Sequence, residues 1–179
     1  MNKLPPEMAV GLMANLLGGN LVKKQEPKPD RTRHELDSMR ALIPEVSGCQ
    51  RCGQCCGFVP MLKCEWEQIE AHLFETGKDD LVDTYNEWVA ALLEKAEAGE
   101  RITDLSDDDW TCPFFSKDTG CEVYPVRPII CRLFGALPKS DPRMKCPNGS
   151  AADNPISKGK HKQVARWLRA KMQQEASAL

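Results

Sequence analysis

Four cysteines fall within eight residues of this chain, and no other feature constrains its fold as strongly. The stretch reads Cys49-Gln-Arg-Cys52-Gly-Gln-Cys55-Cys56-Gly57. A cysteine that binds a metal gives up its proton, so packed thiolates repel one another unless a cation lies between them. The Cys-x-x-Cys spacing lets two sulfurs reach one ion, and glycine at position 53 tolerates the positive φ of a tight turn. The stretch therefore predicts a metal-binding turn.

Two overlapping spacings supply three ligands, Cys49, Cys52 and Cys55, from this one segment. The Cys-x2-Cys-x2-Cys arrangement of ferredoxins holds an iron–sulfur cluster by the same logic. Adjacent side chains point in different directions, so we expect Cys56 to serve a second site or a distant corner of the same site.

The cysteine count also indicates the compartment. The chain has nine cysteines, whereas a secreted disulfide scaffold carries an even number behind a signal peptide. The apolar run 8–17 follows Pro5, Pro6 and Glu7 rather than basic residues, so it does not resemble a signal peptide. It is also shorter than the roughly 20 apolar residues that span a bilayer. We expect a cytoplasmic protein with no membrane association, whose cysteines are reduced or metal-bound.

Charge and aromatic content bear on partners. The formal net charge is −2 at pH 7, which gives no global electrostatic reason to bind nucleic acid. Aromatic residues make up 6% of the chain and are not interleaved with a basic patch, so there is no stacking platform for bases. We expect no nucleic-acid partner, and an unidentified protein partner is left open.

Length and periodicity predict one small, mainly α domain: helices around an irregular cysteine-rich metal-binding core, with at most a short β-hairpin. The chain has 179 residues, and Pro and Gly interrupt the short apolar pieces after position 112. The predicted helices cover 4–22, 34–42, 64–77, 80–98 and 160–176. The predicted parts are an N-terminal helix and linker over 1–33, the metal-binding domain over 34–150, and a C-terminal amphipathic helix packed on it over 151–179.

The later cysteines, Cys112, Cys121, Cys131 and Cys146, stand singly, separated by eight, nine and fourteen residues. A zinc ribbon brings its ligands as two CxxC-type knuckles, so this spacing favours an iron–sulfur cluster over zinc. Eight cysteines suit either two zinc sites or one to two iron–sulfur clusters. The three histidines lie away from the cysteines in sequence, so we do not expect histidine ligands.

Three other residues belong to this interpretation. Arg127 and Arg132 flank Cys131, and we expect both beside the cofactor, where guanidinium groups offset the negative charge of a thiolate-bound centre. The alternative is that they pair with the acidic run 107–109. Cys64 lies near a predicted helix start, where it is either a reactive or spare ligand, or a buried and inert thiol.

Both cysteine sets together closely resemble one family. The second set reads Cys112-Pro-Phe and Gly120-Cys121-x-Val-Tyr124-x2-Arg127-Pro128-x2-Cys131-Arg132, and with the first it resembles the CxxCxxCC family of zinc- or iron-chelating domains. The resemblance covers 49–134 and implies metal binding. Members often place a cysteine after the Cys-Arg-x-Phe segment, where this chain has Gly135-Ala136, and Cys146 is the candidate replacement. The flagellin lysine N-methylase carries a similar cluster, taken to be iron–sulfur.

We therefore predict a metal-binding protein that holds a 4Fe-4S cluster, or alternatively zinc, and acts in electron transfer or as an accessory iron-handling factor. The alternatives are a methyltransferase-like enzyme and a structural-zinc interaction module. The chain has no glycine-rich nucleotide loop and no CxxxCxxC triad, so no catalytic residue is predicted. The predicted metal ligands are Cys49, Cys52, Cys55, Cys56, Cys112, Cys121, Cys131 and Cys146.

Overall fold

The computed structural model describes residues 31–47, 49–50, 52–100, 106, 110–138 and 144–178. The helix predicted over 4–22, residues 23–30 of the predicted linker and the acidic run 107–109 lie outside these residues. The last three residues predicted as linker, 31–33, are helical instead.

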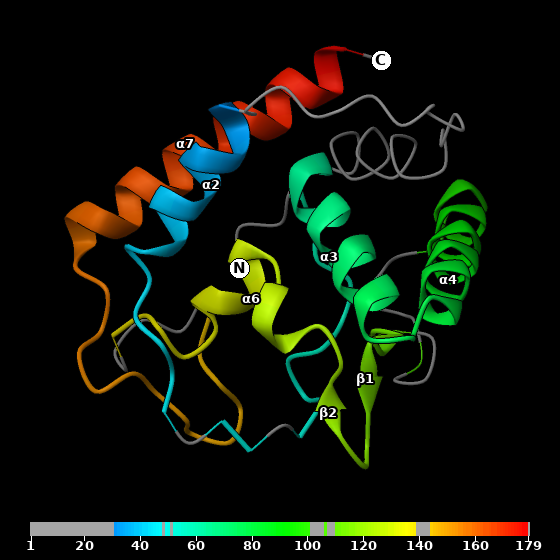
Figure 1. Cartoon of the computed structure of the whole chain (residues 1–179), viewed down its shortest axis with the longest axis horizontal. Helices are drawn as coiled ribbons and strands as arrows, with labels where there is room; N and C mark the ends of the chain where they lie inside the picture. The colour runs from blue at the N-terminus through cyan, green and yellow to red at the C-terminus, as the bar shows by residue number, and fades with distance from the viewer. Residues whose placement is uncertain are drawn as a thin grey trace.

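The described chain is mainly helical, as predicted, and its strands form a single two-stranded antiparallel hairpin (Figure 1). The elements, in order, are α2 (Arg31–Arg40), α3 (Lys63–Glu75), α4 (Asp80–Glu97), β1 (Phe115–Ser116), β2 (Gly120–Cys121), the 3-10 helix η2 (Tyr124–Val126), α6 (Ile129–Leu133) and α7 (Lys158–Ser177). No helix in the described ranges has the length and apolar character needed to cross a bilayer.

The predicted helices agree with α2, α3, α4 and α7 apart from shifts at their ends. Apolar residues at helical spacing become the buried faces, such as Val164, Leu168 and Met172 of α7. The prediction missed α6, because a five-residue helix after Pro128 is too short to show a helical period.

Two apolar clusters form the interior. The first lies between α2, α6 and α7 and includes Leu36, Leu133 and Leu168. The second joins α3, α4 and the hairpin segment and includes Ile69, Val89 and Phe114. Helix α3 contributes to both clusters, with Cys64 in the first and Trp66 in the second.

Aromatic stacking organises the second cluster. The ring of Tyr85 stacks on Phe114 at 4.8 Å between centroids and on Trp66 at 4.9 Å. Such offset contacts add about 0.5–1.5 kcal/mol per pair beyond the burial of apolar area. The stack holds α3 and α4 against the segment that carries Cys112.

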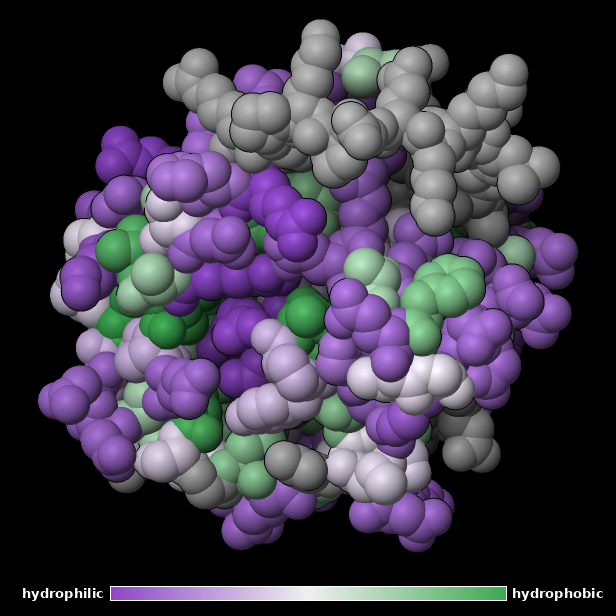
Figure 2. All heavy atoms as spheres, viewed as in Figure 1, coloured by the Kyte–Doolittle hydropathy of each residue, from purple (hydrophilic) through white to green (hydrophobic). Residues whose placement is uncertain are grey.

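Polar contacts pair the first and last described helices, which lie side by side in Figure 1. The indole Nε1 of Trp167 donates to Glu35 at 3.2 Å, and Lys171 forms an ion pair with the same carboxylate at 2.9 Å. Helix α7 therefore packs on the domain through its apolar face and through this contact. Figure 2 shows that the viewed face is mostly hydrophilic, with small separate hydrophobic areas.

Candidate metal centre

One cavity collects cysteines from both halves of the chain. Its volume is about 80 Å³, which is several times what one water molecule needs. All nine cysteines lie among the described residues, and none forms a disulfide. The cysteines in the cavity wall are Cys49, Cys52, Cys55, Cys56, Cys112, Cys121, Cys131 and Cys146.

The first four come from the loop between α2 and α3. The loop turns back at Gly53, whose φ is +77°, and the N–H of Cys56 donates to the carbonyl of Gly53 at 2.8 Å. A Cβ at Gly53 would lie 2.5 Å from the ring of Phe115. Glycine is needed here both for its backbone conformation and for the close approach of the second half of the chain.

Main-chain contacts join the two halves at the cavity. The N–H of Cys112 donates to the carbonyl of Cys56 at 3.2 Å. In the hairpin Phe115 pairs with Cys121, and α6 then carries Cys131. Segments more than fifty residues apart in sequence are thus held together at the thiols.

Cys146 also reaches the cavity, where the expected cysteine after the Cys-Arg-x-Phe segment is absent. The chain turns at Gly135, whose φ is +78°, and its N–H donates to the carbonyl of Met144 at 2.9 Å. A Cβ at Gly135 would lie 2.8 Å from the carbonyl oxygen of Ser150. The turn at glycine brings the Cys146 segment back to the site.

Apolar and aromatic side chains make up most of the remaining wall. They include Met61, Tyr85, Phe114, Phe115, Val123 and Phe134, and no histidine or carboxylate is among the described lining residues. The place of Tyr85 and Phe114 in this wall was not predicted, because their helical or apolar pattern in the sequence indicates only core packing. Only the fold, which brings both side chains into the same wall as the later cysteines, identifies them as residues of the site.

The adjacent thiols of Cys55 and Cys56 are electrostatically unequal. A hydrogen bond from Cys56 lowers the pKa of Cys55 to about 6, against the opposing effect of burial. The pKa of Cys56 is raised, first by that hydrogen bond and then by burial and by the neighbouring thiols of Cys121 and Cys112. The pair therefore shares a proton near neutral pH, with Cys55 as the thiolate.

The later thiols resist ionisation in the metal-free protein. Burial raises the pKa of Cys112 to about 12, and it raises the pKa of Cys121 and Cys131 as well. Charges on Cys112 and Cys121 raise the pKa of Cys131 further. A cation among these sulfurs would lower the pKa of the thiols again, because it stabilises the thiolate form directly.

Arg127 faces this group of thiols. It lines the cavity, and its positive charge lowers the pKa of Cys55, Cys121 and Cys131. Its guanidinium carbon lies 3.9 Å from the ring centroid of Tyr124, while its buried Nε has no hydrogen-bond partner among the described residues. An acceptor inside the cavity would satisfy this donor.

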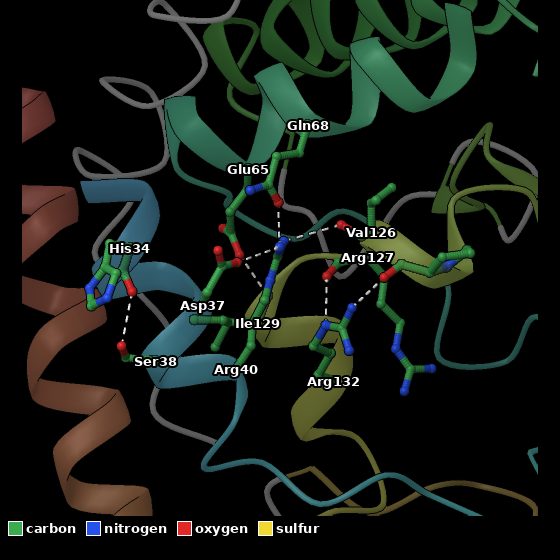
Figure 3. A network of polar contacts seen from close by, with 11 residues as sticks. His34, Asp37, Ser38, Arg40, Glu65, Gln68, Val126, Arg127, Ile129 and Arg132 are labelled. Atoms are coloured by element: carbon green, nitrogen blue, oxygen red, sulfur yellow. Dashed lines mark hydrogen bonds and ion pairs between the residues drawn. The ribbon is translucent and has the colours of Figure 1, made fainter. Parts of the chain in front are cut away.

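Arg132 lies differently. Its guanidinium donates through Nε to the carbonyl of Arg127 at 3.1 Å and through a terminal nitrogen to the carbonyl of Pro125 (Figure 3). It does not line the cavity. Arg132 therefore holds the loop that carries Arg127, and only Arg127 faces the site directly.

Two further sequence-based candidates lie outside the wall. Cys64 is buried, 7% exposed, in the first apolar cluster, which agrees with the buried alternative for this thiol. None of the three histidines, all of them described, lines the cavity. His72 instead contacts the carbonyl of Glu122 at 3.3 Å.

The donor set fits a thiolate-bound metal or cluster, because soft thiolates select zinc and iron–sulfur centres. In the described ranges, no three cysteine, histidine, aspartate or glutamate side chains lie close enough together to coordinate one metal ion. The sulfurs instead surround a shared space. The orphaned Arg127 Nε and the absence of competing hard ligands in the described wall are consistent with an anionic, sulfur-rich occupant.

A comparison with protein families gives one match. The family model described as "CxxCxxCC: Putative zinc- or iron-chelating domain" covers residues 48–149, which is more than half of the chain and includes every cysteine of the cavity wall. No curated protein and no solved structure matches the chain.

Proposed function

The chain belongs to the CxxCxxCC family of zinc- or iron-chelating domains, and from this premise we propose that its cavity holds a 4Fe-4S cluster. We further propose that the protein acts in electron transfer or as an accessory factor that handles iron. Metal chelation is the property of the family, and the cluster is the specific form that the wall of this cavity favours.

The observation that carries the proposal is the convergence of eight thiols on one cavity with an otherwise largely apolar wall. A mononuclear structural zinc site built from thiols alone needs four sulfurs at about 2.3 Å from one ion. Sulfurs that surround a wider space are better suited to a polynuclear centre, whose own atoms fill that space. The apolar wall would exclude water from the inorganic sulfur.

The residues of the chain have distinct tasks in this proposal. A bound cluster supplies reversible one-electron transfer. The cysteine thiolates hold it, Arg127 offsets their negative charge, and Tyr85 and Phe114 shield it. Cys52 is exposed, so the first loop is where an electron or an iron atom would pass to a partner. A reducing compartment such as the cytoplasm would keep these thiols available.

Metal analysis of protein purified without oxygen tests the proposal. We expect iron and acid-labile sulfide in equal amounts, four of each per cluster, together with the visible absorption and the EPR signal of the reduced cluster. The variant Cys121→Ala should lose most of this iron because it removes a wall thiol. Cys64→Ala is the matched control, since that thiol lies in the apolar cluster, and it should retain the iron.

Two results would argue against a cluster. Colourless protein with stoichiometric zinc after anaerobic, iron-replete growth would assign the cavity to structural zinc. Equal metal loss in Cys121→Ala and Cys64→Ala would mean that the thiols of the cavity wall are not the specific ligands of the metal.

A further inference from the structure

Glu65 is the only charged side chain that is buried among the described residues, with 1% of its surface exposed. It lies in the first turn of α3, and its carboxylate accepts two backbone hydrogen bonds. Oε2 accepts from the N–H of Leu62 at 3.0 Å, and Oε1 accepts from the N–H of Ile129 at 2.7 Å. One carboxylate therefore joins the start of α3 to the start of α6, which are distant in sequence.

Polar groups from several elements surround this carboxylate (Figure 3). The positive charges of Arg40 and Arg132 lower the pKa of Glu65, although burial raises it more strongly. Arg40 also hydrogen-bonds the side chain of Gln68 and donates to the carbonyl of Val126 at 3.2 Å. Arg40 and Glu65 thus form a frame that ties α2 and α3 to the segment between Cys121 and Cys131, and Arg132 braces that segment through the carbonyls of Pro125 and Arg127.

The frame reaches the metal centre through α6. Ile129 is the first residue of α6, and Cys131 follows two residues later in the same short helix. The bond from the N–H of Ile129 to Glu65 anchors the first turn of this helix. The position of Cys131 in the cavity wall therefore depends on where Glu65 holds the helix.

Charge and position act in opposite directions at this site. The negative charge of Glu65 raises the pKa of Cys131, so on electrostatic grounds alone it disfavours the thiolate that would bind a metal. Burying a carboxylate is also costly unless its hydrogen bonds are satisfied. A benefit of Glu65 to the metal centre must therefore come from geometry.

We propose that Glu65 is a positioning residue that sets Cys131 against the thiols of the first loop and thereby tightens metal binding. The inference rests on the proposed function of the cavity. It assigns to α3, which contributes no cysteine to the cavity wall, a direct part in building the centre.

Competition for Zn²⁺ with a chromogenic chelator, on the reduced full-length chain, provides the test. Glu65→Gln removes the charge at nearly the same size, and its amide offers one acceptor oxygen to the two N–H groups of Leu62 and Ile129. Because the anchor of α6 is then weakened, we expect Zn²⁺ binding to weaken about tenfold, the lower end of what changes around a metal site cost. If charge alone mattered, the same variant would bind Zn²⁺ more tightly. The direction of the change therefore separates the two effects.

Glu175→Gln is the matched control. Glu175 accepts from the N–H of Lys63 at 3.1 Å, so its carboxylate also supports the start of α3 through a backbone hydrogen bond. It should leave Zn²⁺ binding within about twofold of the wild type. A general effect of loosening α3 would weaken both variants alike and would overturn the proposal.

A double-mutant cycle with Cys131→Ser shows whether Glu65 acts through that thiol. The loss caused by Glu65→Gln should largely disappear in the Cys131→Ser background, whereas a merely structural role would cost the same in both. Unchanged or tighter binding by Glu65→Gln overturns the positioning role alone. Failure of the wild type to bind either Zn²⁺ or iron overturns the proposed function as well.

Amide hydrogen exchange of the wild type provides a second test, which can be made even if Glu65→Gln does not fold. The amide of Ile129 should be protected in the metal-free protein, because Glu65 holds it before any metal is present. Exchange of this amide at the rate of an unstructured loop would overturn the proposal without any variant.

Discussion

At the scale of single residues, the two adjacent cysteines of the first loop differ in a way that alkylation can measure. In the metal-free protein Cys55, with a pKa of about 6, is a thiolate at pH 7, and its alkylation by iodoacetamide should rise with pH around that value. Cys56→Ala removes the hydrogen bond that lowers the pKa, so the rise should move to about 8.5 or above. Mass spectrometry of the alkylated peptides gives both curves, and coincident curves would contradict the assignment.

Arg127 is the one positively charged side chain among the described residues of the cavity wall, so its removal should weaken metal binding. Arg127→Gln loses the charge that favours the thiolates of Cys55, Cys121 and Cys131. We expect roughly tenfold weaker Zn²⁺ binding, the lower end of what outer-shell changes cost. Arg127→Lys keeps a charge and should retain more of the affinity. Equal affinity of Arg127→Gln and wild type, measured by chelator competition, would remove this residue from the site.

At the scale of elements, the turn of the first loop depends on the absence of a side chain at Gly53. Gly53→Ala forces an L-residue to a φ of +77° and places a Cβ against Phe115, so we expect a loss of about 2–5 kcal/mol in the free energy of unfolding. Gly99→Ala is the control, because φ is +84° there but no atom of the described residues lies within 4 Å of the added Cβ. It should cost only about 1–2 kcal/mol in the same urea titration. Equal costs would mean that Phe115 does not pack on this turn.

Helix α3 illustrates how one element can serve two purposes. Its apolar residues divide between the two clusters, while Glu65 binds the first N–H of α6. The hydrophobic pattern of α3 predicts the packing, but it contains nothing that points to α6. That contact depends on a fold that brings residues 65 and 129 together.

At the scale of the whole molecule, the described chain has an apolar part and a thiol-lined part, and we expect only the second to depend on metal. The first apolar cluster, between α2, α6 and α7, is made largely of aliphatic side chains, including Leu36 and Leu168. Among the described residues of the segments 49–57 and 112–121, few main-chain hydrogen bonds hold the chain around the cavity. Removing the metal under reducing conditions should therefore speed amide exchange at least tenfold in those segments and leave α2 and α7 nearly unchanged. A uniform increase along the chain, seen by hydrogen-exchange mass spectrometry, would contradict this division.

The sequence by itself determined the mainly helical class, the longer helices and the thiol chemistry of the candidate site. Apolar residues at helical spacing must be buried on one face, and cysteines at CxxCxxCC spacing suit few purposes other than metal binding. These properties are local, so they can be recognised without knowing the fold.

Only the tertiary structure decided which distant groups meet. It placed Cys146 in the wall and Cys64 in an apolar cluster, although both are single cysteines in the sequence. It turned Arg127 toward the thiols and Arg132 toward backbone carbonyls, and it set Glu65 at the start of α6. The physical reason is that burial and hydrogen bonding between remote segments depend on the packing of the whole chain, and no local pattern of residues records that packing.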